Sequence, residues 1–567
     1  MPERSRLVRK VALGPKDVAV ERRTSGILHL RSPHALGAYP KKLTERLEHW
    51  ASAAGNRILF AQRAGASWRT VTYGQARERA RRLGQYLLSK NLSAERPLAV
   101  LSGNDIEHAL LHLGAMYVGI PYAPISPAYS LLSTDFAKLR SILDLLTPGL
   151  VFVSDRKPFA KALGVVKCEV IDRWEESPAT SAVDDAHARV GPDTIVKFLF
   201  TSGSTGAPKA VINTQRMWCS NQKMIQHMLA FLADEPPVLV DWAPWHHTAA
   251  GNHDLGLVMY NGGSYYIDEG KPLPGAIETT VRNLRQIAPT WYFNVPKGFE
   301  ALLPHLREDE ELRSNFFSRL KVLWFAGAAL PQHVYDEMKE LAYRTCGEEI
   351  PFLTGFGATE TAPATLGRVW PAQNVANMGF PPPGAELKLV PFQDCYEMRV
   401  KGPHVTPGYW RAPELTALAF DDEGYYRLGD AFSYEDDGLL FKGRIAEDFK
   451  LSTGTWVQVG ELRARFIQHF APLVRDVVIA GEGRSEVGAL IFPASPAPAD
   501  AFLNRLKTLM STGSSNRITR AIVLEEPPSL DAGEMTDKGS INQRAVLSRR
   551  RNLVEELYSD SPRVLRA

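Results

Sequence analysis

The alternation of hydrophobic and polar positions predicts strands and helices in a regular order. Residues 72–92 predict a helix whose apolar residues share one face: Ala76, Ala80, Leu83, Tyr86 and Leu87. Short apolar runs at 98–101 and 120–124 then flank a helical segment at 106–118. This strand–helix–strand order with short connections is typical of a mostly parallel sheet covered by helices.

The pattern continues along the chain, with further strands expected at 149–154, 238–242, 265–268 and 322–325. The first ~40 residues are rich in turn formers, and we expect them to form an arm on the main body. The segment RAVLSRRRNLVEELY near the end predicts a docking helix with one apolar stripe: Val546, Leu547, Leu553, Val554 and Leu557. The chain is therefore expected to have an α/β fold.

Composition describes an ordinary globular chain of 567 residues, with 44% apolar and 23% charged residues. The net charge of +3 gives no reason to expect a nucleic-acid partner. The four cysteines lie far apart and read as reduced thiols. No apolar run approaches the ~18 residues that a membrane span needs. We therefore expect a cytoplasmic protein with no membrane partner.

The segment LFTSGSTGAPKAVI (199–212) suits a polyphosphate. Its hydroxyls and glycines can converge on anionic oxygens, and Lys209 adds a positive charge. The residues concerned are Thr201, Ser202, Gly203, Ser204, Thr205 and Gly206. The spacing differs from that of the GxxxxGK[ST] loop. A Ser/Gly surface turn is the alternative interpretation.

This loop resembles the [ST]SG[ST]TGxPKG signature of the adenylate-forming superfamily, which includes acyl-CoA synthetases, firefly luciferase and peptide-synthetase adenylation domains. Residues 201–209 match throughout, and Ala210 replaces the last glycine. The resemblance implies a large N-terminal domain with parallel or mixed sheets, followed by a small mobile α+β domain. The composition also shifts near GRIAEDFK (443–450), and we place the boundary there, between domains 1–445 and 446–567.

DWAPWHHTAAGNHDLG (241–256) carries three histidines after a predicted strand. No carboxylate stands at HExxH spacing, so the sequence argues against zinc. The segment resembles the family's PxFHxxG element, which implies that His247 lines the route between the acyl carboxylate and the phosphate. The alternative is a hydrogen-bonded histidine pair in the core or on the surface. Trp245 and His246 stand where amino-acid-activating relatives carry an Asp, which disfavours an amino-acid substrate.

Two further segments resemble family elements that contact the nucleotide. WFAGAAL (324–330) would lie against adenine and the acyl group through Gly327, Ala328 and Ala329, although tight packing alone explains small residues there. GFGATET (355–361) resembles GYGxTE, with these site residues implied: Phe356, Gly357, Thr359 and Glu360. In that resemblance Phe356 stacks on adenine, Thr359 contacts the α-phosphate and Glu360 holds Mg²⁺, which prefers oxygen ligands.

The ribose and hinge elements follow in the family's order. YYRLGDA (425–431) resembles Y[RK]TGD, and Asp430 would accept hydrogen bonds from the ribose hydroxyls. FKGRIAEDFK resembles the hinge segment GRxxDxxK, in which Arg444 would support the ribose and Lys450 the later thioester-forming arrangement. Ala446 stands at the usual hinge position, and we place the pivot at 446–448.

EMTDKGSINQRAVL (534–547) resembles the TxxGKIxR segment, whose lysine drives adenylation. Alignment of the glycines puts Ser540 where that lysine belongs and Lys538 two positions earlier. We expect Lys538 to reach the same place through the loop. The alternative is a solvated loop lysine.

The resemblance implies an ATP-dependent acid–CoA ligase that uses ATP, Mg²⁺ and coenzyme A. DFKLSTGTWVQVGELRA and TDKGSINQR look most like bacterial feruloyl-CoA synthetases of aromatic acid catabolism, which predicts hydroxycinnamic acids such as ferulate. Four aromatic residues could line a flat pocket or belong to the core: Trp245, Trp291, Tyr292 and Phe293. The alternatives are a fatty or branched-chain acyl-CoA ligase and a non-catalytic nucleotide-binding homologue. A homodimer is left open.

Overall fold

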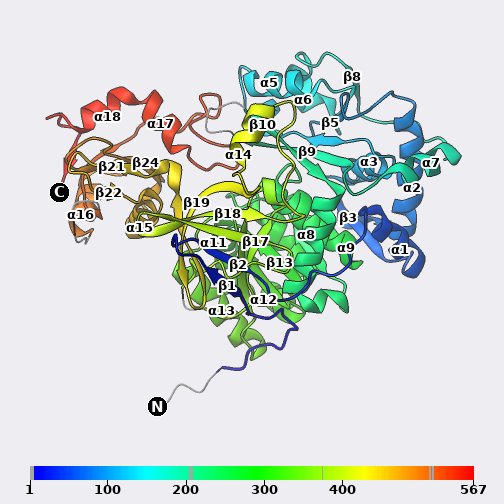
Figure 1. Cartoon of the computed structure of the whole chain (residues 1–567), viewed down its shortest axis with the longest axis horizontal. Helices are drawn as coiled ribbons and strands as arrows, with labels where there is room; N and C mark the ends of the chain where they lie inside the picture. The colour runs from blue at the N-terminus through cyan, green and yellow to red at the C-terminus, as the bar shows by residue number, and fades with distance from the viewer. Residues whose placement is uncertain (1–5, 203–207, 373, 510–512, 514–515) are drawn as a thin grey trace.

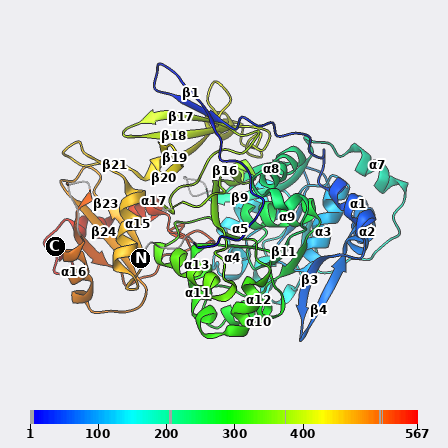
Figure 2. The ribbon, with the colours of Figure 1, turned by 90° about the horizontal axis from the view of Figure 1, so that it is seen from below.

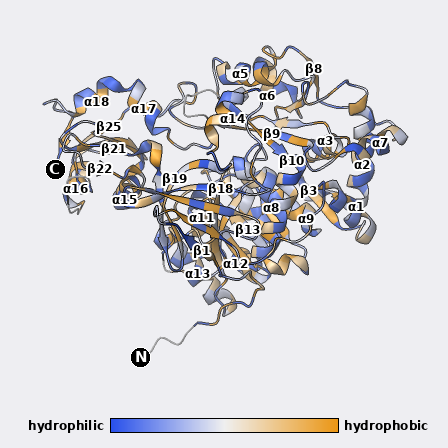
Figure 3. Cartoon of the chain, viewed as in Figure 1, coloured by the Kyte–Doolittle hydropathy of each residue, from blue (hydrophilic) through white to orange (hydrophobic). Residues whose placement is uncertain are grey.

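The computed structural model describes residues 6–202, 208–372, 374–509, 513 and 516–567. Figures 1 and 2 show a large body and, at one end, a smaller part formed by the last ~120 residues. None of the helices in these ranges is both long and apolar enough to cross a membrane. Figure 3 shows hydrophilic and hydrophobic residues side by side on the outer helices, as expected for helices with one buried face.

The first sheet contains the predicted parallel strands. Its spatial order is β10 (Pro208–Thr214), β9 (Ile195–Ser202), β6 (Tyr122–Pro124), β5 (Leu98–Val100), β7 (Leu150–Phe152) and β8 (Glu169–Ile171). All neighbours are parallel except β9 and β10, which form an antiparallel hairpin. This hairpin brackets the predicted phosphate loop.

Helices cover both faces of that sheet. One face meets α2 (Tyr73–Leu88), α3 (Ile106–Tyr117) and α8 (Gln215–Met228), and the other meets α5 (Ala137–Leu146) and α6 (Arg156–Leu163). The predicted helix at 72–92 is α2, which begins after a capping box formed by Thr72 and Gln75. Shorter or peripheral helices complete this region: α1 (Thr44–Ala53), α4 (Ala128–Leu131), α7 (Ser181–Arg189) and the 3₁₀ turn η1 (Ala230–Ala233).

Two four-stranded sheets lie beside the first. One has the order β11 (Val238–Asp241), β12 (Ser264–Ile267), β3 (Ile58–Ala64) and β4 (Ser67–Thr72). The other has the order β13 (Trp291–Asn294), β14 (Val322–Phe325), β15 (Phe352–Gly357) and β16 (Ala364–Arg368). The expected strands near 238, 265 and 322 are thus confirmed. Four helices share a core with β13, β14 and β15: α10 (Ile277–Gln286), α11 (Pro296–Glu308), α12 (Glu310–Ser318) and α13 (Gln332–Cys346).

The N-terminal segment is part of a sheet. In the fourth sheet, β1 (Ala19–Arg22) and β2 (Leu28–Arg31) continue into β17 (Glu386–Phe392), β18 (Cys395–Lys401), β19 (Tyr426–Glu435) and β20 (Gly438–Arg444), all antiparallel. Figure 2 shows β1 beside β17 and β18 at one edge of the body. The expected arm therefore supplies two strands to the sheet that carries Asp430. Helix α14 (Pro413–Ala419) lies in the β18–β19 connection.

The C-terminal part has its own hydrophobic clusters. Its strands are β21 (Phe449–Lys450), β22 (Trp456–Val457), β23 (Val474–Ala480), β24 (Val487–Pro493), β25 (Ile518–Val523) and β26 (Leu565–Arg566). Its helices are α15 (Val459–Phe470), α16 (Ala499–Thr508), α17 (Gln543–Arg549) and α18 (Arg551–Leu557). The boundary at 445/446 stays a prediction, and the 3₁₀ turn η4 (Ile445–Glu447) lies there.

The prediction of a single helix at the end of the chain is wrong, since two helices, α17 and α18, are separated at Arg550. The Arg550 guanidinium donates to the Glu534 carboxylate and to two backbone carbonyls of the preceding loop. The break between α17 and α18 thus lies at the residue that makes these bonds. The apolar stripe still docks, because Val546 and Leu557 are fully buried.

Candidate active site

The predicted phosphate loop is bracketed by paired strands. Thr201 on β9 stands opposite Lys209 on β10, and Ser202 is the last residue of β9. Gly203, Ser204, Thr205 and Gly206 lie outside the described residues. The Lys209 ammonium lies 5.1 Å from the centre of the Tyr409 ring.

Glu360 lies close to the same tyrosine. It belongs to the 3₁₀ turn η3 (Thr359–Thr361), which follows directly from β15, and the residue is only 9% exposed. The Tyr409 hydroxyl donates to Glu360 Oε1 at 3.1 Å and lies 2.9 Å from the Tyr426 hydroxyl. Lys209, Tyr409 and Glu360 therefore form one polar group, in which the carboxylate keeps oxygen atoms for a cation.

The backbone at GFGATET is tight. A side chain at Gly357 would bring its Cβ to 1.5 Å from the Pro363 carbonyl oxygen, so only glycine fits there. Phe356 packs against Phe432 and Phe441, with ring centres 5.0 and 5.6 Å away. Thr359, beside Glu360, is half-buried.

The GAA segment leaves room for a ligand after β14. Gly327, Ala328 and Ala329 are all exposed, and Gly327 has a φ of +86°, which favours glycine. The strand before them ends in the buried pair Trp324 and Phe325. The small side chains thus begin where the sheet ends.

Asp430 and Arg444 face each other on β19 and β20. Arg444 Nε lies 3.0 Å from Asp430 Oδ1, an oxygen for which no hydrogen-bond partner lies among the described residues. Burial raises the pKa of the Asp430 carboxyl to about 6, although the Arg444 charge opposes this shift. Asp430 is 2% exposed. This buried oxygen is ion-paired with Arg444 but accepts no hydrogen bond from the described residues, which suits a ligand that brings hydroxyl groups.

The histidine pair follows β11. The His246 and His247 rings lie 4.2 Å apart in a T-shaped arrangement, and the next turn is the π-helix η2 (Ala249–Asp254). Both Nε2 atoms point at one oxygen from the other end of the chain. His246 lies 3.2 Å and His247 3.1 Å from Asp537 Oδ2. Burial would raise the pKa of the Asp537 carboxyl, but the bonds from the two imidazoles outweigh it and lower that pKa. Asp537 is therefore ionised, and both imidazoles donate to it.

Lys538 lies beside Asp537 on a tight turn of the Lys538 loop, which we define as residues 524–542. The Thr536 carbonyl accepts from Gly539 N, the Ser540 carbonyl accepts from Thr536 N, and Gly539 takes a φ of +81°. The Lys538 side chain is exposed to solvent but surrounded at longer range by protein, which lowers the pKa of its ammonium. The charges of Asp537 and Glu360 act in the opposite direction. The turn therefore brings Lys538 within the electrostatic influence of Glu360.

The positive charge of Lys538 also affects the pKa of His247. Burial lowers the pKa of the His247 imidazole well below its usual value, and the positive charge of Lys538 lowers it further. His247 is thus a neutral donor at ordinary pH. The charge of Lys538 therefore acts on two residues from other segments, His247 and Glu360.

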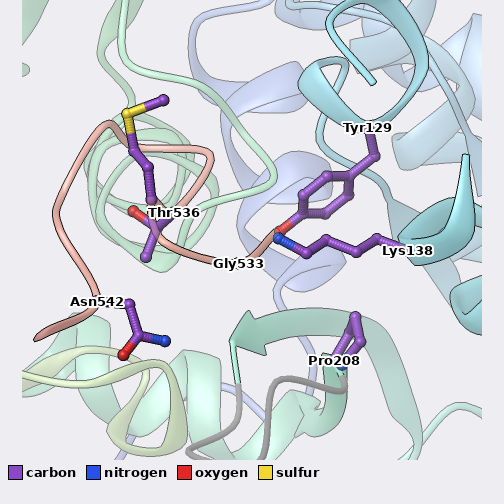
Figure 4. A pocket seen from close by; sticks show the side chains of 7 residues that line it. Tyr129, Lys138, Pro208, Gly533, Thr536 and Asn542 are labelled. Atoms are coloured by element: carbon purple, nitrogen blue, oxygen red, sulfur yellow. The ribbon is translucent and has the colours of Figure 1, made fainter. Parts of the chain in front are cut away.

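A small pocket lies where the Lys538 loop meets the large body (Figure 4). Tyr129 and Lys138 lie on one side of it, Thr536 and Asn542 lie on the other, and Pro208 marks the start of β10. The pocket therefore lies beside the predicted phosphate loop.

Lys450 lies elsewhere in this structure. It belongs to β21, and its ammonium lies 5.1 Å from the centre of the Trp456 ring. Next to it, Asp448 Oδ1 accepts from Val459 N, and burial raises the pKa of the Asp448 carboxyl to about 6.

Sequence reasoning missed Asp537 and Tyr409. Within the histidine segment no carboxylate stands at metal-binding spacing, whereas Asp537 lies 290 residues beyond His247. Its ligand atom and those of His246 and His247 lie within 4.8 Å of one another, so these three could hold a metal ion. The hydrogen bonds already explain this arrangement. The position of Asp537 next to the predicted catalytic lysine was the one available signal.

Two family models match the chain. Residues 47–410 match the family model of AMP-binding enzymes, and residues 449–562 match the AMP-binding enzyme C-terminal domain. The chain is 25% identical to a 3-hydroxybenzoate–CoA ligase of Aromatoleum sp. (strain CIB), over 82% of this chain and 90% of that protein. It is also 25% identical to a feruloyl-CoA synthase of Amycolatopsis sp., over 84% and 94%.

Among solved structures, the anthranilate CoA ligase AuaEII in complex with anthranoyl-AMP superposes with a TM-score of 0.72 at 19% identity. The match covers 92% of this chain and 99% of that one. It confirms the expected fold, with mixed α/β sheets and a small C-terminal domain. Because the two family models also cover most of the sequence, the chain belongs to the family of AMP-binding enzymes.

Proposed function

We propose that this protein is an ATP-dependent acid–CoA ligase that forms an acyl-adenylate and then a CoA thioester. The observation that carries the proposal is the pair of hydrogen bonds from His246 and His247 to Asp537, which holds the neighbouring Lys538 against the large body. The charge of Lys538 also acts on the Glu360 carboxylate and on the neutral His247 imidazole. This set suits the transfer of a nucleotide from ATP to a carboxylate.

The first half-reaction activates the acid. A carboxylate oxygen attacks the α-phosphorus of ATP, the bond to the β-phosphate oxygen breaks, and pyrophosphate leaves with both electrons. Lys209 and Lys538 would stabilise the negative charge that develops on the phosphate oxygens. His247 would line this site without donating to the substrate, because its one N–H already donates to Asp537.

The second half-reaction releases AMP. The thiolate of coenzyme A attacks the acyl carbonyl, a tetrahedral oxyanion forms, and the carbon–oxygen bond to AMP breaks. Lys538 has no task in this step. We propose that the small domain turns about residues 446–448 between the two steps and that Lys450 then takes part, as the family resemblance implies.

Glu360 is proposed to hold Mg²⁺. Its carboxylate is mostly buried and accepts one hydrogen bond at Oε1, from Tyr409, which leaves oxygen atoms for a hard cation. The metal, when bound, would neutralise phosphate charge. Tyr409 would orient the carboxylate.

We propose an aromatic acid, hydroxycinnamic in class, as the substrate. The names of the relatives support this, since they include ligases of hydroxybenzoate, ferulate and anthranilate. The aromatic residues before the exposed GAA segment belong to the core, since Trp291 and Trp324 are buried in one cluster. The His253 ring lies 5.8 Å from that of Trp291 and 6.2 Å from that of Trp324. Trp245 also belongs to the core, because its indole donates to the buried Tyr265 hydroxyl at 3.1 Å.

The test is a pair of assays on the full chain. ATP–pyrophosphate exchange should depend on an added aromatic acid, and thioester formation should follow with coenzyme A. A panel of hydroxycinnamic, benzoic, fatty and branched-chain acids identifies the preferred class. Preference for the aliphatic acids would favour the fatty or branched-chain alternative. No exchange with any acid would favour a non-catalytic nucleotide-binding homologue.

Asp430 supplies a prediction about ATP binding and pH. Asp430→Ala should raise the KM for ATP about 10- to 100-fold, because two ribose hydroxyls lose a charged acceptor worth about 1.5–3 kcal/mol. Since the pKa of Asp430 is raised to about 6, the wild-type carboxyl gains a proton as pH falls through 6. The KM for ATP should therefore rise below that pH.

The control for this pH effect is Asp430→Asn, which keeps an acceptor but cannot titrate. Its KM for ATP should be higher than that of the wild type at neutral pH and nearly constant at lower pH. The measurement is kcat/KM for ATP between about pH 5 and 8. An unchanged KM in Asp430→Ala removes this residue from the nucleotide site.

A further inference from the structure

The Lys538 loop is attached to the large body at three places. The Lys138 ammonium donates to the Leu530 carbonyl at 2.7 Å. The backbone and hydroxyl of Thr134 donate to Asp531 Oδ2 at 3.0 and 2.8 Å. The third attachment is the bond pair from His246 and His247 to Asp537, which lies next to Lys538.

The attachment at Asp537 differs from the one at Asp531 in burial. The Asp537 side chain is 12% exposed, and the two imidazoles are 12% and 13% exposed. The bonds between Thr134 and Asp531 lie in an exposed setting. Hydrogen bonds to an ionised group are stronger than neutral ones, and the loss of water strengthens them further. Asp537 is therefore the attachment with the largest expected effect on the docked loop.

Lys538 itself does not anchor the turn. Among the residues that the structure describes, its ammonium has no recorded hydrogen bond or ion pair. It stays exposed while its neighbour Asp537 is held. The turn that joins them is closed by two backbone hydrogen bonds, between Thr536 and Gly539 and between Thr536 and Ser540. The position of the Lys538 backbone thus follows from that of the Asp537 carboxylate.

We propose that Asp537 is a positioning residue for adenylation: its carboxylate, held by His246 and His247, docks the Lys538 loop and presents Lys538 to the reactants. This inference rests on the proposed function. It assigns the histidine pair a second task, as the receptor of the loop. The contact exists only while the small domain is docked as seen here, so it stabilises the arrangement of the first half-reaction and must break before the second.

The test compares the two half-reactions in Asp537→Asn and Asp537→Ala. Acid-dependent ATP–pyrophosphate exchange should fall about 10- to 100-fold through kcat, because a charge-assisted contact is lost. The KM for ATP should change little, since the Asp537 side chain accepts its hydrogen bonds from the two histidines among the residues described. Thioester formation from supplied acyl-AMP should stay near the wild-type rate. An equal loss in both half-reactions would indicate a merely structural role and overturn the proposal.

The matched control is Asp531→Asn, in the same loop at the exposed attachment. It should slow exchange by less than about fivefold, as expected for exposed polar contacts. His246→Ala tests the receptor side. The double variant with Asp537→Ala should lose far less than the product of the two single losses, because the partners act together. If the rate loss of the double variant equals the product of the two single losses, the proposal is overturned.

The outcome for the wild type separates this inference from the proposed function. If the wild-type chain shows no acid-dependent exchange, the proposed function fails and this inference fails with it. If the wild type exchanges and Asp537→Asn exchanges equally fast, only the positioning role is wrong. Thermal unfolding of each variant identifies those that do not fold, and Asp537→Asn is then the variant that decides, because it conserves shape.

Discussion

Lys538→Ala is expected to reduce acyl-adenylate formation by a factor on the order of 10²–10³, because a charge that acts on developing negative charge is lost. The structure supports the assignment of this role to Lys538, which lies two positions before the place of the lysine in the family's TxxGKIxR segment. The turn at 536–540 places Lys538 under the influence of Glu360 and beside the docked Asp537. Ser540, at the aligned position, has no charge to offer.

The second half-reaction is the internal control for this variant. Thioester formation from supplied acyl-AMP should stay largely intact in Lys538→Ala, because the lysine acts only in the docked arrangement. Lys538→Arg keeps the charge and should recover part of the first rate. If Lys538→Ala hardly changes the rate of acyl-adenylate formation, the role belongs to Lys450. The Lys450→Ala variant should then show the adenylation defect.

Glu360→Gln is expected to abolish adenylation at ordinary Mg²⁺ concentrations, or to require far more Mg²⁺, because the neutral amide is a poor ligand for this cation. A second measurement does not depend on turnover. Titration calorimetry should show that Mg²⁺ strengthens ATP binding to the wild type and has little effect on the variant. Full activity of Glu360→Gln at ordinary Mg²⁺ would contradict the assignment.

Tyr409→Phe is the matched control for Glu360. It removes the hydroxyl that donates to Oε1 at 3.1 Å but keeps the carboxylate. We expect a moderate loss of rate, near tenfold or less for one hydrogen bond, and a Mg²⁺ dependence close to that of the wild type. A Tyr409→Phe variant as impaired as Glu360→Gln would indicate that the polar group acts through the tyrosine.

Local elements and single motifs were predictable from the sequence, because their signals lie within a few residues. Helix α2 and strands β5, β6 and β14 follow from apolar periodicity. Contacts between distant segments were not predictable. The pairing of β2 with β17 and the bond from His247 to Asp537 depend on how two remote segments meet in space. The break between α17 and α18 was not predictable either, because the partner of Arg550 is Glu534, which lies outside both helices.

The order of strands in the fourth sheet has a consequence for synthesis on the ribosome. Leu30 pairs with Leu387, so the hairpin β1–β2 is made long before the strand that completes its sheet. At about 5–20 residues per second, this interval lasts roughly 20–70 s. During that time the backbone edge of β2 has no partner strand and is open to chaperones or to nascent neighbours. The sheet that carries Asp430 is therefore completed late, when residues 386–444 have left the ribosome.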